Sequence, residues 1–164
     1  MEALLNNNSL CPCGSGLEYS DCCGVYHNGS RYAPTAEALM RSRYSAFVLK
    51  LEAYVLATWD STKRPKGVEF ASDPTQWQRL EIIECKKGLA NDTKGIVEFK
   101  AYYQMHEDDY VLHEISRFVK RENRWFYLDG TVKALAKPKQ ETNLGLNAPC
   151  ACGSGKKYKR CCGK

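Results

Sequence analysis

The sequence lacks the features that would place it in several large functional classes. No apolar run approaches the ~20 residues that a membrane-spanning helix needs, and the first ten residues, MEALLNNNSL, lack the basic-then-apolar order of a signal peptide. There is also no phosphate-binding glycine loop, no HExxH motif and no Ser-His-Asp order. These absences predict a cytoplasmic protein with no membrane span and no strong catalytic signature.

The composition is that of a globular protein of modest size. Of the 164 residues, 43% are hydrophobic and 26% are charged. This usage argues against a wholly disordered, collagen-like or coiled-coil chain. A chain of this length can form one domain with small appendages, but not two domains of full size.

Cysteine is the residue that the sequence has in excess. Eight of its nine cysteines lie near the two ends, in two copies of one pattern: C-x-C, eight further residues, then C-C. Aligned without a gap, CPCGSGLEYSDCCG (11–24) and CACGSGKKYKRCCG (150–163) share the cysteines, Gly-Ser-Gly, a tyrosine and the final glycine. The chain therefore carries an internal repeat at its two ends. The ninth cysteine, Cys85, is expected to be a small buried hydrophobic residue in a strand.

The spacing of each quartet suits a tetrahedral metal site. Two close pairs of thiolates on two short backbone pieces can surround a zinc ion, and Gly-Ser-Gly lets the chain reverse between them. These units contain too few apolar residues to fold without metal. A disulfide framework is the alternative, but the missing signal peptide and the repetition of one pattern favour metal. The predicted ligands are Cys11, Cys13, Cys22 and Cys23 for one structural zinc ion, and Cys150, Cys152, Cys161 and Cys162 for a second.

The two cysteine units differ in charge. Residues 1–24 contain three acidic residues and no lysine or arginine, whereas residues 150–164 contain five basic residues and no acidic one. Because four thiolates outweigh the charge of one Zn²⁺, two occupied sites would lower the formal charge of the chain from +5 to about +1. The chain is then nearly neutral, and we expect any difference in partner between the two units to arise from this asymmetry.

Both units resemble the SEC-C motif, the metal-binding tail of the bacterial Sec translocase motor ATPase, whose pattern is CxCGSGKKYKxC followed by Cys or His. The C-terminal copy follows this pattern closely, whereas the N-terminal copy has Leu17, Glu18, Ser20 and Asp21 in the basic segment. The resemblance implies zinc, with iron as the alternative metal, and contact with protein partners. In the translocase tail that partner is a secretion chaperone, and lipid and ribosome contacts are also associated with it. Such a contact is not expected at the N-terminal copy.

The residues between the two motifs predict an α+β domain. Apolar residues recur at helical spacing from about 35 to 50, after an N-cap at Thr35. Residues 60–75 are rich in turn-forming residues and are expected to form a loop. Four strands follow, at 78–85, 97–105, 111–120 and 124–130. A tight turn at Glu122-Asn123 joins the last two strands. Helices followed by antiparallel strands favour a cone-like, curved antiparallel sheet wrapped around the N-terminal helices.

The predicted organisation has four parts. They are an N-terminal zinc module (1–28), the α+β domain (30–132), a polar linker (133–148) and a C-terminal zinc module (149–164). The fold class is therefore α+β, with the central domain flanked by two small zinc-binding modules.

Three segments of the middle region carry a second resemblance. Bracketed by the cysteine motifs, TAEALMRSRYSAF (35–47), HEISRF (113–118) and WFYLDG (125–130) resemble the YchJ family of bacterial SEC-C proteins. The resemblance covers nearly all of the chain and implies a central domain similar to the nuclear-transport-factor and SnoaL-like cone fold. The biochemical role of the family is uncharacterised, so the resemblance implies no activity for this chain. One departure is Asp60, which stands where the family pattern has a histidine.

Cone folds often enclose a pocket, and strand alternation identifies residues that would line it. Glu114 and Ser116 share one face of their strand, and Tyr127 and Asp129 share one face of the next. If the two faces coincide, these side chains meet beside the helix, with Arg41 or Arg43 as a partner. The group is then either a general acid/base pair tuned by a dry pocket or a buried network that fixes helix against sheet. The second interpretation is favoured.

Two functions remain open. The one we favour is a non-catalytic protein-interaction adaptor that uses its zinc modules, with secretion, chaperone or ribosome proteins as the partners that the SEC-C resemblance implies. The alternative is a small-molecule enzyme, hydrolase- or isomerase-like, with its site in the central pocket. Nucleic acid is not favoured as a partner, because the C-terminal basic cluster is short and has no aromatic platform beyond Tyr158. The sequence does not fix the oligomeric state.

Overall fold

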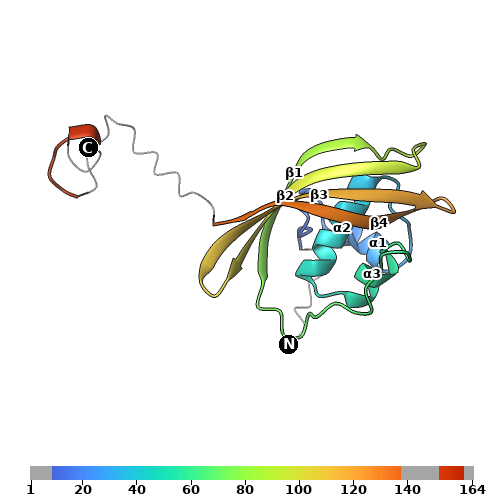
Figure 1. Ribbon diagram of the computed structural model, residues 1–164. Coiled ribbons are helices and arrows are strands. Elements are labelled where there is room, and N and C mark those ends of the chain that lie inside the picture. Colours follow the sequence, from blue (N-terminus) through green and yellow to red (C-terminus); the bar gives the residue numbers. More distant parts are fainter. Residues whose placement is uncertain (1–8, 138–151, 161–164) are drawn as a thin grey trace.

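In the computed structural model, the described residues are 9–137 and 152–160, and they form an α+β fold (Figure 1). Short helical pieces come first, then two longer helices, four long strands and a last 3₁₀ turn. The elements are η1 Tyr19–Asp21, α1 Gly24–His27, α2 Ala36–Val48, α3 Glu52–Ala57, β1 Gln76–Lys87, β2 Lys94–Met105, β3 Asp108–Arg121, β4 Arg124–Ala136 and η2 Tyr158–Arg160. The predicted order of helices followed by strands is confirmed. Within the described ranges, no helix has the length and apolar character to span a membrane.

The strands form one antiparallel sheet in the order β1-β2-β3-β4, so each strand lies beside the next in sequence. Two-residue turns, His106-Glu107 and Glu122-Asn123, join β2 to β3 and β3 to β4, and all four turn residues have positive φ. Turns of this kind match the right-handed twist of the strands, and the predicted Glu122-Asn123 turn is confirmed. Register shifts in the β1–β2 and β3–β4 ladders add bulges, which bend the sheet.

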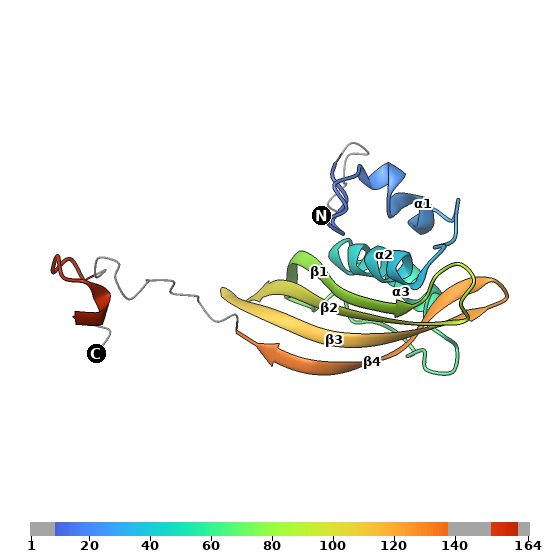
Figure 2. The ribbon, with the colours of Figure 1, turned by 90° about the horizontal axis from the view of Figure 1, so that it is seen from above.

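Helix α2 lies on the concave face of the curved sheet (Figures 1 and 2). It begins after Thr35, whose Oγ1 accepts a hydrogen bond from the Ala38 N–H at 3.1 Å, as expected for an N-cap. The buried side chains of the helix meet inward-facing side chains of all four strands. This core contains Ala33, Ala36, Leu39, Met40, Tyr44, Leu80, Val97, Phe99, Ala101, Phe118 and Trp125.

Residues 9–28 form a third layer. Figure 2 shows them on the side of α2 that faces away from the sheet. Helix α1 contacts α2 directly. Helix α2 is therefore covered on two sides, which explains why its polar residues Ser42 and Ser45 are fully buried.

The secondary structure of residues 133–136 and the exposure of Cys85 differ from the sequence prediction. Strand β4 continues to Ala136, so residues 133–136, predicted as linker, are strand. Lysine and alanine have low strand propensity, but pairing with β3, as in Val111 with Ala136, supplies the ladder that the local sequence does not signal. Cys85, predicted to be buried, is exposed because β1 is an edge strand of the sheet. The remainder of the predicted linker lies outside the described residues.

Candidate functional site

The four N-terminal cysteines converge on one point. The sulfurs of Cys11, Cys13, Cys22 and Cys23 all lie within 4.8 Å of one another. Two of the separations are 3.6 Å, between Cys13 and Cys22, and 4.0 Å, between Cys22 and Cys23. Four sulfurs at ~2.3 Å from a tetrahedral zinc ion stand about 3.8 Å apart. The quartet therefore has the donor type and the spacing that such an ion requires.

Local backbone geometry brings the two cysteine pairs together. Gly14 and Gly16 adopt φ of 76° and 79°, values that favour glycine, and the Cys11 N–H donates to the Leu17 carbonyl across the resulting reversal. The second pair lies where η1 ends and α1 begins. A Cβ on Gly24 would lie 2.6 Å from the Tyr19 carbonyl oxygen, so glycine is required after the second pair. The predicted reversal at Gly-Ser-Gly is therefore present, and the structure has a short helical turn at the second pair.

Close packing makes the protonation of the four thiols interdependent. Hydrogen bonds from the Cys13 and Cys23 thiols lower the pKa of Cys11 far below its ordinary value. The pKa of Cys23 is raised, chiefly by its hydrogen bond to Cys11, and burial raises the pKa of Cys22 to about 11. One thiolate is thus stabilised while its neighbours hold their protons. A divalent cation removes this conflict, because a coordinated thiol is deprotonated outright.

The quartet is fixed to helix α2 by several contacts. Ser45 Oγ lies 3.4 Å from the Cys23 sulfur and 3.7 Å from the Cys11 sulfur, and Arg41 Nη1 donates to the Cys13 carbonyl at 3.1 Å. Cys13 is 0% exposed. A metal ion bound here would therefore stabilise the contact between the N-terminal segment and the central domain.

His27 has both ring nitrogens occupied by protein groups. Its Nε2 donates to the Ser42 carbonyl at 2.8 Å, so Nδ1 is the acceptor for the Tyr19 hydroxyl at 2.7 Å. Burial lowers the pKa of His27, which favours this neutral form. The histidine joins the N-terminal segment to α2.

The described part of the C-terminal motif repeats the N-terminal backbone. Gly153 and Gly155 have φ of 77° and 71°, and η2 follows as η1 does in the first copy. Cys152 is exposed. The other three predicted ligands, Cys150, Cys161 and Cys162, lie outside the described residues. The surface differs from that of the first copy, because four cationic side chains are exposed here: Lys156, Lys157, Lys159 and Arg160.

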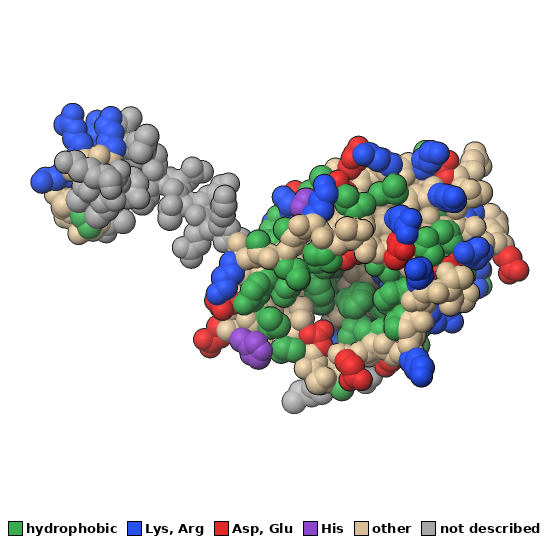
Figure 3. Space-filling view, viewed as in Figure 1, with side chains coloured by type: hydrophobic (Ala, Val, Ile, Leu, Met, Phe, Trp, Pro, Cys, Tyr) green, Lys and Arg blue, Asp and Glu red, His purple; other side chains and the backbone are tan. Residues whose placement is uncertain are grey.

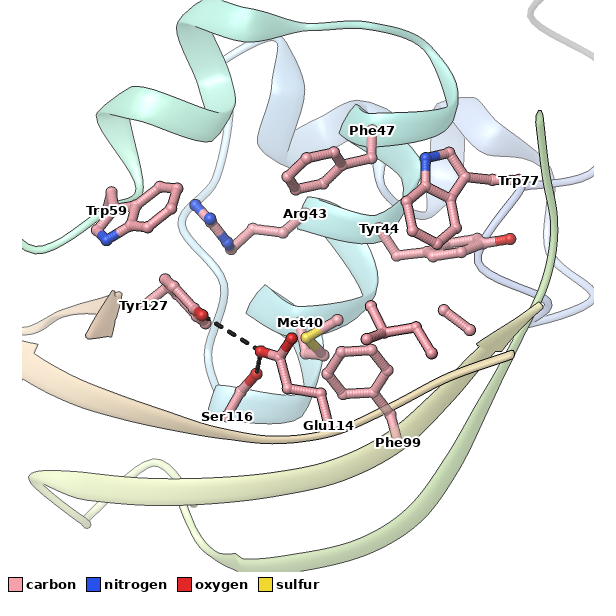
Figure 4. Close-up of a pocket in the computed structure, with 12 residues that line it drawn as sticks. Met40, Arg43, Tyr44, Phe47, Trp59, Trp77, Phe99, Glu114, Ser116 and Tyr127 are labelled. Atoms are coloured by element: carbon pink, nitrogen blue, oxygen red, sulfur yellow. Dashed lines mark hydrogen bonds between the residues drawn. The ribbon is translucent and has the colours of Figure 1, made fainter. Parts of the chain in front are cut away.

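A cavity of about 260 Å³ lies between α2 and the concave face of the sheet. Figure 3 shows a hollow bordered by hydrophobic side chains on this side of the molecule, and Figure 4 shows the residues that line the cavity. Polar groups gather at one end, and aromatic and aliphatic groups at the other. The lining residues are Met40, Arg43, Tyr44, Phe47, Trp59, Trp77, Phe99, Ala101, Leu112, Glu114, Ser116 and Tyr127.

Glu114 is held at the polar end by two hydroxyl groups. Its Oε1 accepts from Ser116 Oγ at 2.7 Å and from the Tyr127 hydroxyl at 3.2 Å (Figure 4). A Cβ on Gly130 would lie 2.0 Å from this oxygen and 2.8 Å from the Tyr127 hydroxyl. Any larger residue at position 130 would therefore displace the Glu114 carboxylate from its place beside the Tyr127 hydroxyl. Gly130 was not a predicted site residue, although it ends the WFYLDG segment.

Arg43 is a buried cation in the same cavity wall. Its Nη1 donates to the Val55 carbonyl at 2.6 Å and to Thr58 Oγ1 at 2.7 Å. The guanidinium carbon stands 4.6 Å from the ring centre of Tyr127 and 5.1 Å from that of Trp59. Burial lowers the pKa of Arg43 to about 10, so it is still protonated at neutral pH. No carboxylate of a described residue forms an ion pair with it.

Asp129, predicted to join Glu114 and Tyr127, lies on the opposite face of the sheet. Arg117 pairs with Asp129 and Phe118 with Tyr127, so Leu128 is the extra residue of a β-bulge. The bulge reverses the alternation after Tyr127 and turns Asp129 outward. There it accepts two hydrogen bonds from Arg117, at 2.6 and 2.5 Å, and this guanidinium lowers its pKa.

Asp60 has a structural environment. It is 1% exposed, and its carboxylate accepts hydrogen bonds from Arg121 Nε at 2.5 Å and from Thr62 Oγ1 at 2.5 Å. These two donors lower the pKa of Asp60 to about 2, and Arg121 has the larger effect. Its own N–H donates to the Tyr127 carbonyl. The residue joins the loop after α3 to the β3–β4 hairpin.

Comparison with known proteins agrees with these features. Residues 35–130 match the family described as YchJ, middle NTF2-like domain, and residues 8–24 and 147–164 match the SEC-C motif. The fold and the cysteine cluster define the class as an NTF2-like domain flanked by SEC-C motifs. UPF0225 proteins of Photorhabdus laumondii and Geobacter sulfurreducens are 44% and 40% identical, over 94% of this chain and 98% of each relative. The chain belongs to the YchJ family.

Two solved structures are similar to this fold. A SEC-C motif containing protein from Psychrobacter arcticus is 34% identical, with a TM-score of 0.59 over 93% of this chain and 94% of that one. A SEC-C motif containing protein from Rhodopseudomonas palustris is 32% identical, with a TM-score of 0.64 over 74% of this chain and 96% of that one.

Proposed function

We propose that this protein is a zinc-dependent adaptor whose C-terminal module binds an acidic surface of a protein partner. The observation that carries the proposal is the exposed cationic cluster on and beside η2, formed by Lys156, Lys157, Lys159 and Arg160. Four neighbouring cations with exposed side chains favour an anionic surface through long-range attraction. The N-terminal copy has no such cluster.

Each module would hold one zinc ion with four thiolates and no open position. The sulfur spacing of the N-terminal quartet supports the first ion. The motif match and the repeated glycine conformations support the second, with Cys150, Cys152, Cys161 and Cys162 as its ligands. Thiolate sites of this kind persist in reducing compartments, which supports a cytoplasmic location.

The two modules would serve different purposes. The N-terminal module is structural, because three of its cysteines are buried and its contacts are directed at α2. At its surface Leu10 and Leu17 are exposed, and the acidic Glu18 and Asp21 follow where the C-terminal copy has Lys157 and Arg160. An acidic partner is therefore directed to the C-terminal module.

Capture of partners from lysate tests this division. The full-length zinc-loaded protein should retain partners that Lys156→Glu/Lys157→Glu loses, and moderate salt should release them because the contact is electrostatic. The control Arg79→Glu/Lys86→Glu makes the same charge change on exposed residues of β1 and should retain them. Loss with both variants, or with neither, would contradict the proposal.

Metal analysis tests the zinc assignment separately. Protein purified without added metal should contain about two zinc ions per chain, and Cys161→Ser/Cys162→Ser about one. A content below one in the wild type, with oxidised cysteine pairs, would refute the assignment. Iron in place of zinc would keep the ligands and change only the metal.

The central cavity favours a second candidate function, a small-molecule enzyme. Glu114 contacts two hydroxyl groups there, but Asp129 lies on the other face, so the paired carboxylates expected from the sequence do not form. Acid and base chemistry would then rest on Glu114 and Tyr127. Burial raises the pKa of Tyr127, which keeps its hydroxyl protonated as a donor. Turnover of a bound small molecule that Glu114→Gln abolishes would support this function, and binding without turnover would contradict it.

A further inference from the structure

The cavity of the central domain has polar groups that the fold does not use. Arg43 carries five N–H donors, of which Nη1 makes the two hydrogen bonds to Val55 and Thr58. Its Nε and Nη2 make no hydrogen bond to a described residue, and the guanidinium lies beside the Tyr127 and Trp59 rings. Glu114 binds Ser116 and Tyr127 through Oε1, and its Oε2 likewise has no described partner.

The opposite end of the cavity is apolar. Tyr44, Phe47, Trp77 and Phe99 face the interior there, with Met40 beside them (Figure 4). Phe47 and Trp77 meet edge to face, with ring centres 6.2 Å apart. Such a wall accepts a flat apolar body by stacking and edge contacts.

The volume limits the size of an occupant. An apolar cavity of about 150 Å³ is large enough to bind benzene, and this cavity is about 260 Å³. One ring with a polar substituent, or two small fused rings, therefore fits, whereas an extended cofactor or a peptide does not. An occupant of this size would place a ring at the aromatic end and a polar group between Arg43 and Glu114.

The two charges decide what that polar group is. Arg43 attracts an anion, but Glu114 in the same wall repels it, and for a cation the two effects are reversed. A neutral group with an acceptor beside a donor satisfies both side chains and leaves no new charge in the pocket. We propose that the cavity is a binding site for a small neutral ring compound bearing an amide-like group, its carbonyl accepting from Arg43 and its N–H donating to Glu114. This site is independent of the proposed adaptor function.

Four probes of one shape test the ligand class. Benzamide, benzoate, benzamidinium and toluene place a neutral amide, an anion, a cation and a methyl group on the same ring. Titrated into full-length protein and followed by NMR shifts of the Trp59 and Trp77 indole N–H groups, benzamide should bind about tenfold more tightly than toluene and more tightly than either ion. Tightest binding of benzoate or benzamidinium, equal binding of toluene, or no saturable shift with benzamide would overturn the proposal.

Two variants separate binding from folding. Glu114→Gln removes the charge and keeps the shape, so benzamide binding should weaken about fivefold while benzoate binding strengthens, because Arg43 is then unopposed. A merely structural Glu114 would change all four probes alike, and that result would refute its role. Ala101→Leu fills the cavity from β2 and should abolish binding of every probe; unchanged binding in this variant would place the probes elsewhere. Backbone amide spectra of both variants verify that the fold is retained.

Discussion

The buried carboxylate of Asp60 makes a stability prediction that depends on pH. Asp60→Asn removes the charge while keeping the size and the hydrogen bond from Thr62. The lost interaction is the charge-assisted hydrogen bond from Arg121, whose side chain is about half exposed. Such a bond contributes about 1–2 kcal/mol when one partner remains in contact with water. For a chain of this length that corresponds to a fall in Tm of roughly 3–6 °C at pH 7.

The pH dependence of that loss follows from the direction of the pKa shift. An unfolded aspartate titrates near pH ~3.9, and Asp60 in the folded protein titrates near 2 because Arg121 and Thr62 stabilise its anion. The contribution is therefore fully present above the unfolded pKa and is lost as pH falls through the folded one. Wild type and Asp60→Asn should differ at pH 7, converge between about pH 4 and pH 2, and be equal below that.

Thermal unfolding followed by circular dichroism, repeated from pH 7 to pH 2, measures this difference directly. The other carboxylates titrate in both proteins, so their effect cancels in the comparison. Asp129→Asn is the matched control, because Asp129 pairs with Arg117 on the open face of the sheet and should cost less. A difference that stays constant with pH, or that is absent at pH 7, would refute the assignment of a buried anion at Asp60.

Two further perturbations concern the cysteine quartet and the cavity. Cys13→Ser, or chelation of the metal, should lower Tm and remove the dispersion of the amide chemical shifts of residues 9–28 in NMR spectra. Cys85→Ser, on the exposed edge strand, should change neither quantity. Equal effects of the two substitutions would contradict a metal site. Gly130→Ala places a methyl group in the Glu114 carboxylate and should cost about 1–3 kcal/mol in urea unfolding. Gly67→Ala, whose added methyl would stand 3.4 Å from a Glu52 oxygen, should be nearly neutral, and an equal loss there would contradict the role of the close contact at Gly130.

Local chemistry explains which parts of the structure the sequence predicts. The cysteine spacing predicts the quartet because metal binding requires two close pairs, and that requirement is met within fourteen residues. The N-cap at Thr35 and the turn at Glu122-Asn123 depend on neighbouring residues in the same way. None of these features needs information about a distant strand.

Features set by pairing between strands are the ones that sequence patterns miss. The bulge at Leu128 depends on how β4 aligns with β3, and this one extra residue moves Asp129 from the cavity to the outer face. Arg43 and Glu114, in contrast, reach the cavity as expected, because helical and strand periodicity hold up to that point. Gly130 could have been noticed as a glycine inside a strand pattern, which often marks a close approach.

In the proposed function, the two copies of the SEC-C motif would use one backbone for two purposes. In the first copy, Ser45 and Arg41 of α2 contact the cysteine segment, and His27 donates a hydrogen bond to the helix. Part of the surface of the first copy is therefore buried against α2. In the second copy, the described residues retain four exposed cations. Charge changes in the second copy should therefore alter partner binding without lowering stability, whereas loss of a cysteine in the first copy should lower stability before it affects any partner.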